Sequence, residues 1–216
     1  MSRQAQIMIG ALVLIVGGMI ALFVFGGGNS AAPLPAVDPS KLVRADSHTT
    51  GSGTTTLVEF GDIQCPACGV AEPWVQQART DFAGKVTFVF RNFPLTQLHP
   101  NAMNAAEAVE AAGSQGKYWE MHDKLYATQA EWSNLSDPSA QFVIYATAVG
   151  VPDIAKFKSD IAAKAFASRI QEDVDDGNAL GINATPTFFI NGVQQTSIAS
   201  YSDLKNALNA GIKAKK

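Results

Sequence analysis

Apolar residues along the chain fall into strand-length runs and longer segments of helical period. Two β-branched and apolar runs, residues 54–60 (TTTLVEF) and 85–91 (KVTFVFR), predict strands. The segment between them, residues 66–82, has helical composition and ends near Gly84. Together these three segments predict a β-α-β unit.

The next eighty residues carry a different pattern. From His99 to about Leu180 the chain is alanine-rich and periodic, with breaks at glycine and proline. We expect helices over residues 100–112, 117–130, 138–148, 152–160 and 163–180. This block predicts an all-helical insertion at about 95–182.

The chain returns to strand patterning after the insertion. Residues 187–190 (TFFI) and 193–198 (VQQTSI) flank Asn191-Gly192, a pair typical of a type I′ hairpin turn. A final helix is expected at about 201–210. The order of elements predicts an α/β sheet domain over residues 54–216, interrupted by helices.

The N-terminal region has no amphipathic period. Residues 7–25 lack any charged or strongly polar side chain, and as a helix they span about 28 Å, close to the hydrocarbon core of about 30 Å. We expect them to form a transmembrane signal anchor, with residues 1–6 cytoplasmic and the rest of the chain extracytoplasmic. Arg3 supports this orientation weakly. A cleaved signal peptide is the alternative, with Ser30-Ala31-Ala32 as a weak cleavage site.

Residues 26–53 are rich in Gly, Ser, Thr, Ala and Pro and show no sustained hydrophobic period. Such composition is typical of a tether, so we predict a flexible linker over this range. Its last residues, from Lys41 onward, are expected at most to dock on the domain as an irregular lead-in.

Composition narrows the possible functions. The formal net charge is −3, and the 16 basic residues less Arg3 leave 15 against 19 acidic ones, which argues against a nucleic-acid binder. The chain has only two cysteines, Cys65 and Cys68. This count excludes both a disulfide-stapled scaffold and a self-contained four-cysteine zinc site.

The two cysteines stand in the sequence Cys65-Pro66-Ala67-Cys68, where a predicted helix begins. The first thiol therefore faces unpaired backbone N–H groups and the positive end of the helix dipole, which stabilise a thiolate. The two-residue gap allows the sulfurs to form a disulfide, and proline is favoured in a first helical turn. The pattern predicts a redox-active pair.

Half of a zinc site and inert structural cysteines are the alternatives for this pair. Zinc would have to recruit His48, His99 and His122, which are scattered and lack metal-ligand spacing, so we predict no metal and no cofactor. We expect His99 and His122 to be packing or surface residues of the insertion. Asp62 is expected to be a turn or loop residue.

Four sequence blocks together resemble one known family. They are residues 58–68 (VEFGDIQCPAC), 91–100 (RNFPLTQLHP), 116–123 (GKYWEMHD) and 181–188 (GINATPTF). In this order they are similar to the DsbA-like thiol-disulfide oxidoreductases of the thioredoxin superfamily, especially the membrane-anchored bacterial members. The resemblance covers about residues 54–212. It implies a thioredoxin fold with an all-helical insertion, preceded in this chain by one transmembrane helix.

The resemblance also implies roles for individual residues. Thr185 and Pro186 correspond to the cis-proline loop, which offers its backbone to a substrate segment. Glu59, six residues before Cys65, corresponds to an acid beneath the disulfide that assists proton transfer with the buried cysteine. From the residues alone, an outward-facing Glu59 and a trans Pro186 at the start of an edge strand are open alternatives.

The favoured function is the introduction of disulfides into exported proteins through Cys65 and Cys68. The expected partners are exported or cell-surface proteins with free thiols and a membrane redox partner that reoxidises the pair, with the chain itself a monomer. Ala67 stands where strongly oxidising members of the family commonly carry histidine, so a protein disulfide reductase or isomerase is an alternative. A CxxC metal-binding protein or metallochaperone is an alternative of another class.

Overall fold

The computed structural model describes residues 37–215, and the predicted cytoplasmic residues 1–6 and signal anchor 7–25 lie outside this range. Among the described helices, none combines the length and apolar character needed to cross a bilayer. Residues 37–215 contain a five-stranded mixed sheet with the strand order β1-β3-β2-β4-β5.

The predicted β-α-β unit forms the centre of this sheet. Strand β2 (Thr55–Gly61) and strand β3 (Val86–Asn92) pair in parallel, and helix α3 (Pro66–Asp81) connects them. Each strand starts and ends one residue later than predicted. Both strands are buried on both faces, which explains their nearly continuous apolar sequences.

The predicted hairpin supplies the two strands on the other side of β2. Strand β4 (Thr187–Ile190) pairs antiparallel with β2 and with β5 (Val193–Gln195). Asn191 and Gly192 have φ values of 49° and 85°, so both central turn residues have the positive φ of a type I′ turn. Strand β5 is shorter than predicted, and helix α10 (Tyr201–Ala214) is longer and packs beside α3.

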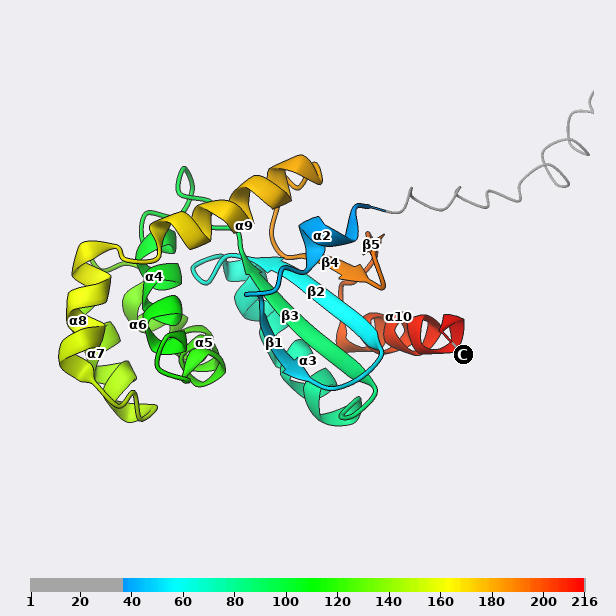
Figure 1. The fold of residues 1–216 in the computed structure, drawn as a ribbon, viewed down its shortest axis with the longest axis horizontal. Helices are drawn as coiled ribbons and strands as arrows, with labels where there is room; N and C mark the ends of the chain where they lie inside the picture. Colours follow the sequence, from blue (N-terminus) through cyan, green and yellow to red (C-terminus); the bar gives the residue numbers. More distant parts are fainter. Residues whose placement is uncertain (1–36, 216) are drawn as a thin grey trace, which may run out of the picture. The chain divides into compact units, whose positions relative to one another are not determined.

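The all-helical insertion lies to one side of the sheet (Figure 1). Its helices are α4 (Ala102–Gly113), α5 (Tyr118–Ala127), α6 (Gln129–Trp132), α7 (Ser139–Ala148), α8 (Ile154–Ala163) and α9 (Ala167–Ala179). The single helix predicted over 117–130 is divided into α5 and α6 at Thr128, whose hydroxyl bonds the Lys124 carbonyl. Helix α9 leads the chain back to the sheet (Figure 1).

The flexible linker predicted over 26–53 is wrong for part of its described residues. Helix α2 (Pro39–Leu42) and strand β1 (His48–Gly51) form there, and β1 pairs antiparallel with β3 at the sheet edge. Strand β1 is short and polar, and its sequence follows no hydrophobic period. It forms because its backbone pairs with β3. The sheet domain therefore begins before residue 54.

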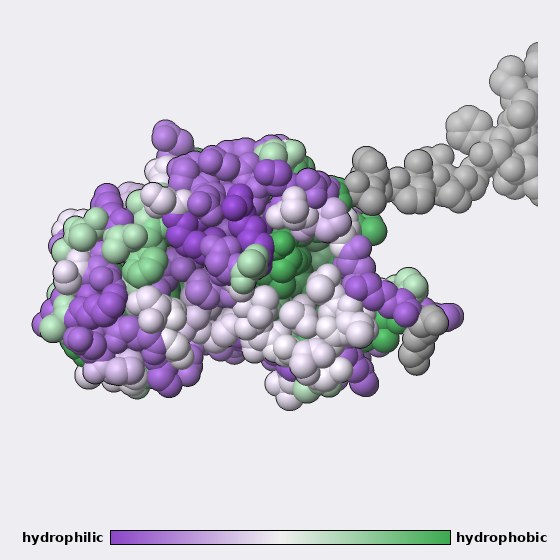
Figure 2. Space-filling view, viewed as in Figure 1, coloured by the Kyte–Doolittle hydropathy of each residue, from purple (hydrophilic) through white to green (hydrophobic). Residues whose placement is uncertain are grey.

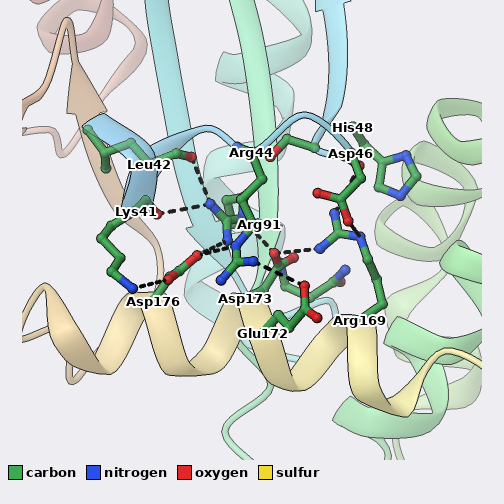
Figure 3. A network of polar contacts seen from close by, with 12 residues as sticks. Lys41, Leu42, Arg44, Asp46, His48, Arg91, Arg169, Glu172, Asp173 and Asp176 are labelled. Atoms are coloured by element: carbon green, nitrogen blue, oxygen red, sulfur yellow. Dashed lines mark hydrogen bonds and ion pairs between the residues drawn. The ribbon is translucent and has the colours of Figure 1, made fainter. Parts of the chain in front are cut away.

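A buried ion network fastens this N-terminal segment to the sheet and to α9 (Figure 3). The fully buried Arg91 on β3 bonds Asp173 at 2.6 Å and Asp176 at 2.8 Å, and also donates to two carbonyls of α2. Burial alone would raise the pKa of Asp176, but hydrogen bonds from Arg44, Arg91 and Lys41 hold that pKa well below its usual range. Where this network reaches the surface, it adjoins the hydrophilic band along α9 in Figure 2.

Candidate active site

The two cysteines lie where β2, α3 and the helical insertion meet. Cys65 is the N-cap residue of α3, and both cysteines are free thiols that belong to the same core cluster as the insertion. Cys65 is 7% exposed and Cys68 is fully buried at 0%. Cys65 is therefore the sulfur that a second protein reaches first.

The surroundings of Cys65 stabilise its thiolate. A hydrogen bond with the Cys68 thiol is the main cause that lowers the pKa of Cys65 to about 5, against the opposing effect of burial. The Thr185 side chain and the backbone N–H groups of Ala67 and Cys68 act in the same direction. Among the described residues the Thr185 hydroxyl has no hydrogen-bond partner, so it is free to donate to the sulfur. The two backbone donors are those that the start of a helix is expected to provide.

The second sulfur has the opposite character. Burial raises the pKa of Cys68 well above its usual value, and the hydrogen bond to Cys65 and the charge of Glu59 add to the effect. At neutral pH the reduced pair therefore holds a thiolate at Cys65 and a thiol at Cys68. This asymmetry suits an attacking cysteine that a partner can reach and a resolving cysteine that it cannot.

Glu59 points into the protein interior. It lies on the central strand β2, in register with Phe90 of β3 and Phe188 of β4, and is 4% exposed. Burial raises the pKa of Glu59 to about 8, while Arg79 lowers it and the charge of Cys65 raises it further. The outward-facing alternative is therefore wrong, and the carboxyl is mainly protonated at neutral pH.

The loop before β4 lies against the reactive sulfur. The Thr185–Pro186 peptide bond is cis, as the family resemblance implied, and the trans alternative is wrong. The backbone carbonyl of Thr185 lies 3.6 Å from the Cys65 sulfur and accepts a hydrogen bond from it when Cys65 is protonated. Pro66 and Ala67 occupy the first turn of α3 between the cysteines. The structure thus brings together every residue that the sequence proposed for the site.

The sequence did not predict that His99 and Gln129 contact the loop that carries Cys65. Asp62 is in a loop, as predicted, but it is buried and accepts from His99 Nδ1 at 2.6 Å, from the Gln64 amide at 2.8 Å and from the Leu95 amide at 2.9 Å. Gln129 on the insertion donates to the Cys65 carbonyl at 3.0 Å. The contacts of Asp62 with Leu95 and His99, and that of Gln129 with Cys65, join residues distant in the sequence, so no local spacing reveals them.

Each of the three histidines lies against a carboxylate. His48 bonds Glu110 at 2.8 Å, His99 bonds Asp62, and His122 lies 3.0 Å from Asp123. The described residues place Glu72, His122 and Asp123 in one cluster of possible ligand atoms. Arg79 supplies a cation to this cluster, because its guanidinium bonds Glu72 at 3.0 Å and Asp123 at 2.7 Å.

Comparison with known proteins identifies the family. The family model described as Thioredoxin matches residues 47–210, so the chain belongs to the thioredoxin family. The oxidised BdbD structure from Bacillus subtilis is 26% identical, with a TM-score of 0.70 over 77% of this chain and 93% of that one. A thioredoxin-like oxidoreductase from Silicibacter pomeroyi DSS-3 is 27% identical, with a TM-score of 0.67 over 82% and 99% of the two chains. The chain is a DsbA-like protein thiol-disulfide oxidoreductase.

One relative is a longer protein that contains a region similar to this chain. The Na(+)/H(+) antiporter NhaA 1 of Salinispora arenicola (strain CNS-205) is 43% identical over 158 residues, which are 72% of this chain and 22% of the antiporter. The chain thus spans about a fifth of that relative's length. The antiporter name describes the longer protein, and the similarity concerns only the matched part.

Proposed function

We propose that this oxidoreductase works as an oxidase that introduces disulfides into exported proteins. The observation that carries the proposal is the difference between the two thiols, with the pKa of Cys65 lowered to about 5 and that of Cys68 raised. A thiolate stabilised in the reduced enzyme is a good leaving group, so the corresponding disulfide is a strong oxidant.

The proposed reaction has two exchange steps. A substrate thiolate attacks Cys65 of the Cys65–Cys68 disulfide, the S–S bond breaks, and Cys68 leaves and takes a proton from Glu59. A second substrate thiolate then attacks the substrate sulfur of the mixed disulfide, and Cys65 leaves as a thiolate. The substrate loses two electrons and gains a disulfide, and the enzyme gains both electrons as a dithiol.

The cis-proline loop is proposed to hold the substrate during these steps. Thr185 and Pro186 precede β4, and the Thr185 carbonyl faces the Cys65 sulfur at 3.6 Å. An extended substrate segment that pairs with this backbone places its own sulfur beside Cys65. Main-chain pairing accepts many sequences, as an enzyme with many exported substrates requires.

The location and partners are part of the same proposal. Residues 7–25 anchor the chain in the cell membrane by a single pass, and residues from 26 onward lie outside the cytoplasm, where disulfides persist. A membrane redox partner reoxidises the dithiol, and the oxidoreductase acts as a monomer. Full-length protein is expected in the membrane fraction, with its domain open to protease added from outside. A soluble form beginning near residue 30 would contradict the anchor.

Ala67 supports a second candidate function. It offers no imidazole to the Cys65 thiolate, so a protein disulfide reductase or isomerase is the alternative within the same chemistry. Oxidation of a reduced, unfolded secreted protein by one equivalent of oxidised enzyme separates the two. An oxidase transfers its disulfide nearly to completion within the assay. A reductase leaves the substrate thiols unchanged and reduces the native substrate instead.

A further inference from the structure

A small cavity lies beneath the active site, between Glu59 and His122. Its volume is about 10 Å³, which is about the space that one water molecule needs. The rest of its wall is apolar and is formed by Leu57, Val75, Phe88, Val89, Phe90 and Trp119. A water in this cavity has two polar side chains to contact, one toward the cysteines and one toward α5.

The imidazole of His122 is buried, and only one of its two ring nitrogens has a hydrogen-bond partner among the described residues. Its Nδ1 lies 3.0 Å from Asp123 Oδ1, and its Nε2 has no hydrogen-bond partner among the described residues. The rings of Phe90 and Tyr126 pack edge-on against it, with centroids 4.6 Å and 4.9 Å away. When Nδ1 donates to the carboxylate, Nε2 is left as an acceptor without a protein partner.

On the side away from the cavity, His122 contacts Asp123, whose side chain reaches solvent. The Asp123 side chain is 36% exposed and is joined through Arg79 to the buried Glu72. Burial raises the pKa of Glu72 to about 7, although His122 lowers it. The titratable and charged groups around the imidazole are Glu59 on β2, Glu72 and Arg79 on α3, and Tyr118, Asp123 and Tyr126 on α5.

We propose that His122, with one water in this cavity, relays protons between Glu59 and the solvent-facing Asp123. The inference rests on the proposed role of Glu59. When Cys68 attacks the Cys65 mixed disulfide, its proton passes to the Glu59 carboxylate, then through the water to His122 Nε2, while Nδ1 releases a proton toward Asp123. The proton moves the opposite way when Cys68 leaves as a thiolate. His122 is thus a positioning residue that acts through Glu59 and does not touch the sulfurs.

The test measures how fast Cys68 resolves a mixed disulfide between Cys65 and glutathione. Asparagine cannot shuttle a proton as imidazole does, so His122→Asn is expected to slow resolution about tenfold at neutral pH, below the roughly hundredfold of a direct acid–base group. The solvent deuterium isotope effect on resolution is expected to rise, because proton transfer limits the rate. The matched control is His48→Asn, at a half-buried histidine that also bonds a carboxylate but does not line the cavity.

Two further variants keep the result decisive. Asp123→Asn, at the partly exposed end, is expected to slow resolution without removing the imidazole. Glu59→Gln combined with His122→Asn is expected to be no slower than Glu59→Gln alone, because both act in one path. Wild-type resolution in His122→Asn, with Glu59→Gln slow, would overturn the relay alone. Wild-type resolution in Glu59→Gln would overturn the role of Glu59 and the relay with it.

Discussion

The Cys65 sulfur lies 3.6 Å from the backbone carbonyl of Thr185, next to the cis bond that leads to Pro186. These residues are 120 positions apart in the sequence, and the whole helical insertion lies between them. Their contact sets the nucleophile beside a stretch of backbone suited to strand-like pairing. The reactive sulfur and the backbone proposed to bind substrate therefore lie side by side.

The first prediction concerns the division of labour between the cysteines. Cys68→Ser is expected to trap substrates covalently on Cys65, because the more accessible of the two sulfurs still reacts and the resolving thiol is missing. Non-reducing electrophoresis of the variant with a disulfide-bonded secreted substrate detects the complex, because the Cys65 thiolate attacks the substrate S–S bond and releases one substrate thiolate. Cys65→Ser is the control and is expected to trap little. Trapping by Cys65→Ser alone would reverse the assignment.

The second prediction concerns the pH dependence of stability at Glu59. Its folded pKa is raised from 4.5 to about 8, so the folded state holds a proton that the unfolded state releases, and stability falls as pH rises between these values. Glu59→Gln removes this loss. It is expected to gain about 2 kcal/mol or more on the wild type between pH 4 and pH 8, since one pKa unit is worth about 1.4 kcal/mol.

Urea denaturation of both proteins across this pH range measures the difference. The comparison is made within one redox state, because the cysteines also titrate. A constant difference between Glu59→Gln and the wild type from acid to pH 8 would show that the carboxyl is not shifted upward.

The third prediction concerns Cys65, whose effect has the opposite sign. Its folded pKa is lowered from 9.0 to about 5, so the reduced protein gains stability as pH rises from 5 toward 9 and loses it as pH falls through 5. Cys65→Ser should lack this gain. Thermal or urea unfolding of the reduced proteins checks it, and an equal pH slope in both would count against a stabilised thiolate.

The fourth prediction concerns the ion network of Arg91. Replacement of Arg91 by alanine leaves the carboxylates of Asp173 and Asp176 buried with less compensation, which typically costs about 3–5 kcal/mol. Lys156→Ala is the control, because the Lys156–Asp160 pair is exposed, and such pairs contribute about 1 kcal/mol or less. Equal losses in the free energy of unfolding would show that the buried network contributes no more than a surface ion pair.

Local signals account for the elements that the sequence predicted correctly. The apolar runs of β2 and β3, the Asn191-Gly192 turn and the cysteine pair at the start of α3 each depend on a few adjacent residues. Strand β1 escaped prediction because four mostly polar residues carry no period and gain their conformation from β3.

The missing parts of the site are long-range contacts. The Asp62–His99 pair is separated by 37 residues, and Arg91 meets Asp173 across 82 residues. Each partner alone reads as an ordinary polar residue, and only the fold shows that it is buried and paired. His122 likewise shows its relation to Glu59 only when α5 packs over the sheet.

The reduction potential of the Cys65–Cys68 pair tests the oxidase assignment most directly. Equilibration with glutathione buffers of known ratio, followed by alkylation of the free thiols, measures it. The lowered pKa of Cys65 predicts a potential well above the roughly −270 mV of thioredoxin and toward the roughly −120 mV of a strongly oxidising DsbA. A potential at or below about −270 mV would contradict the account and make the protein a reductant.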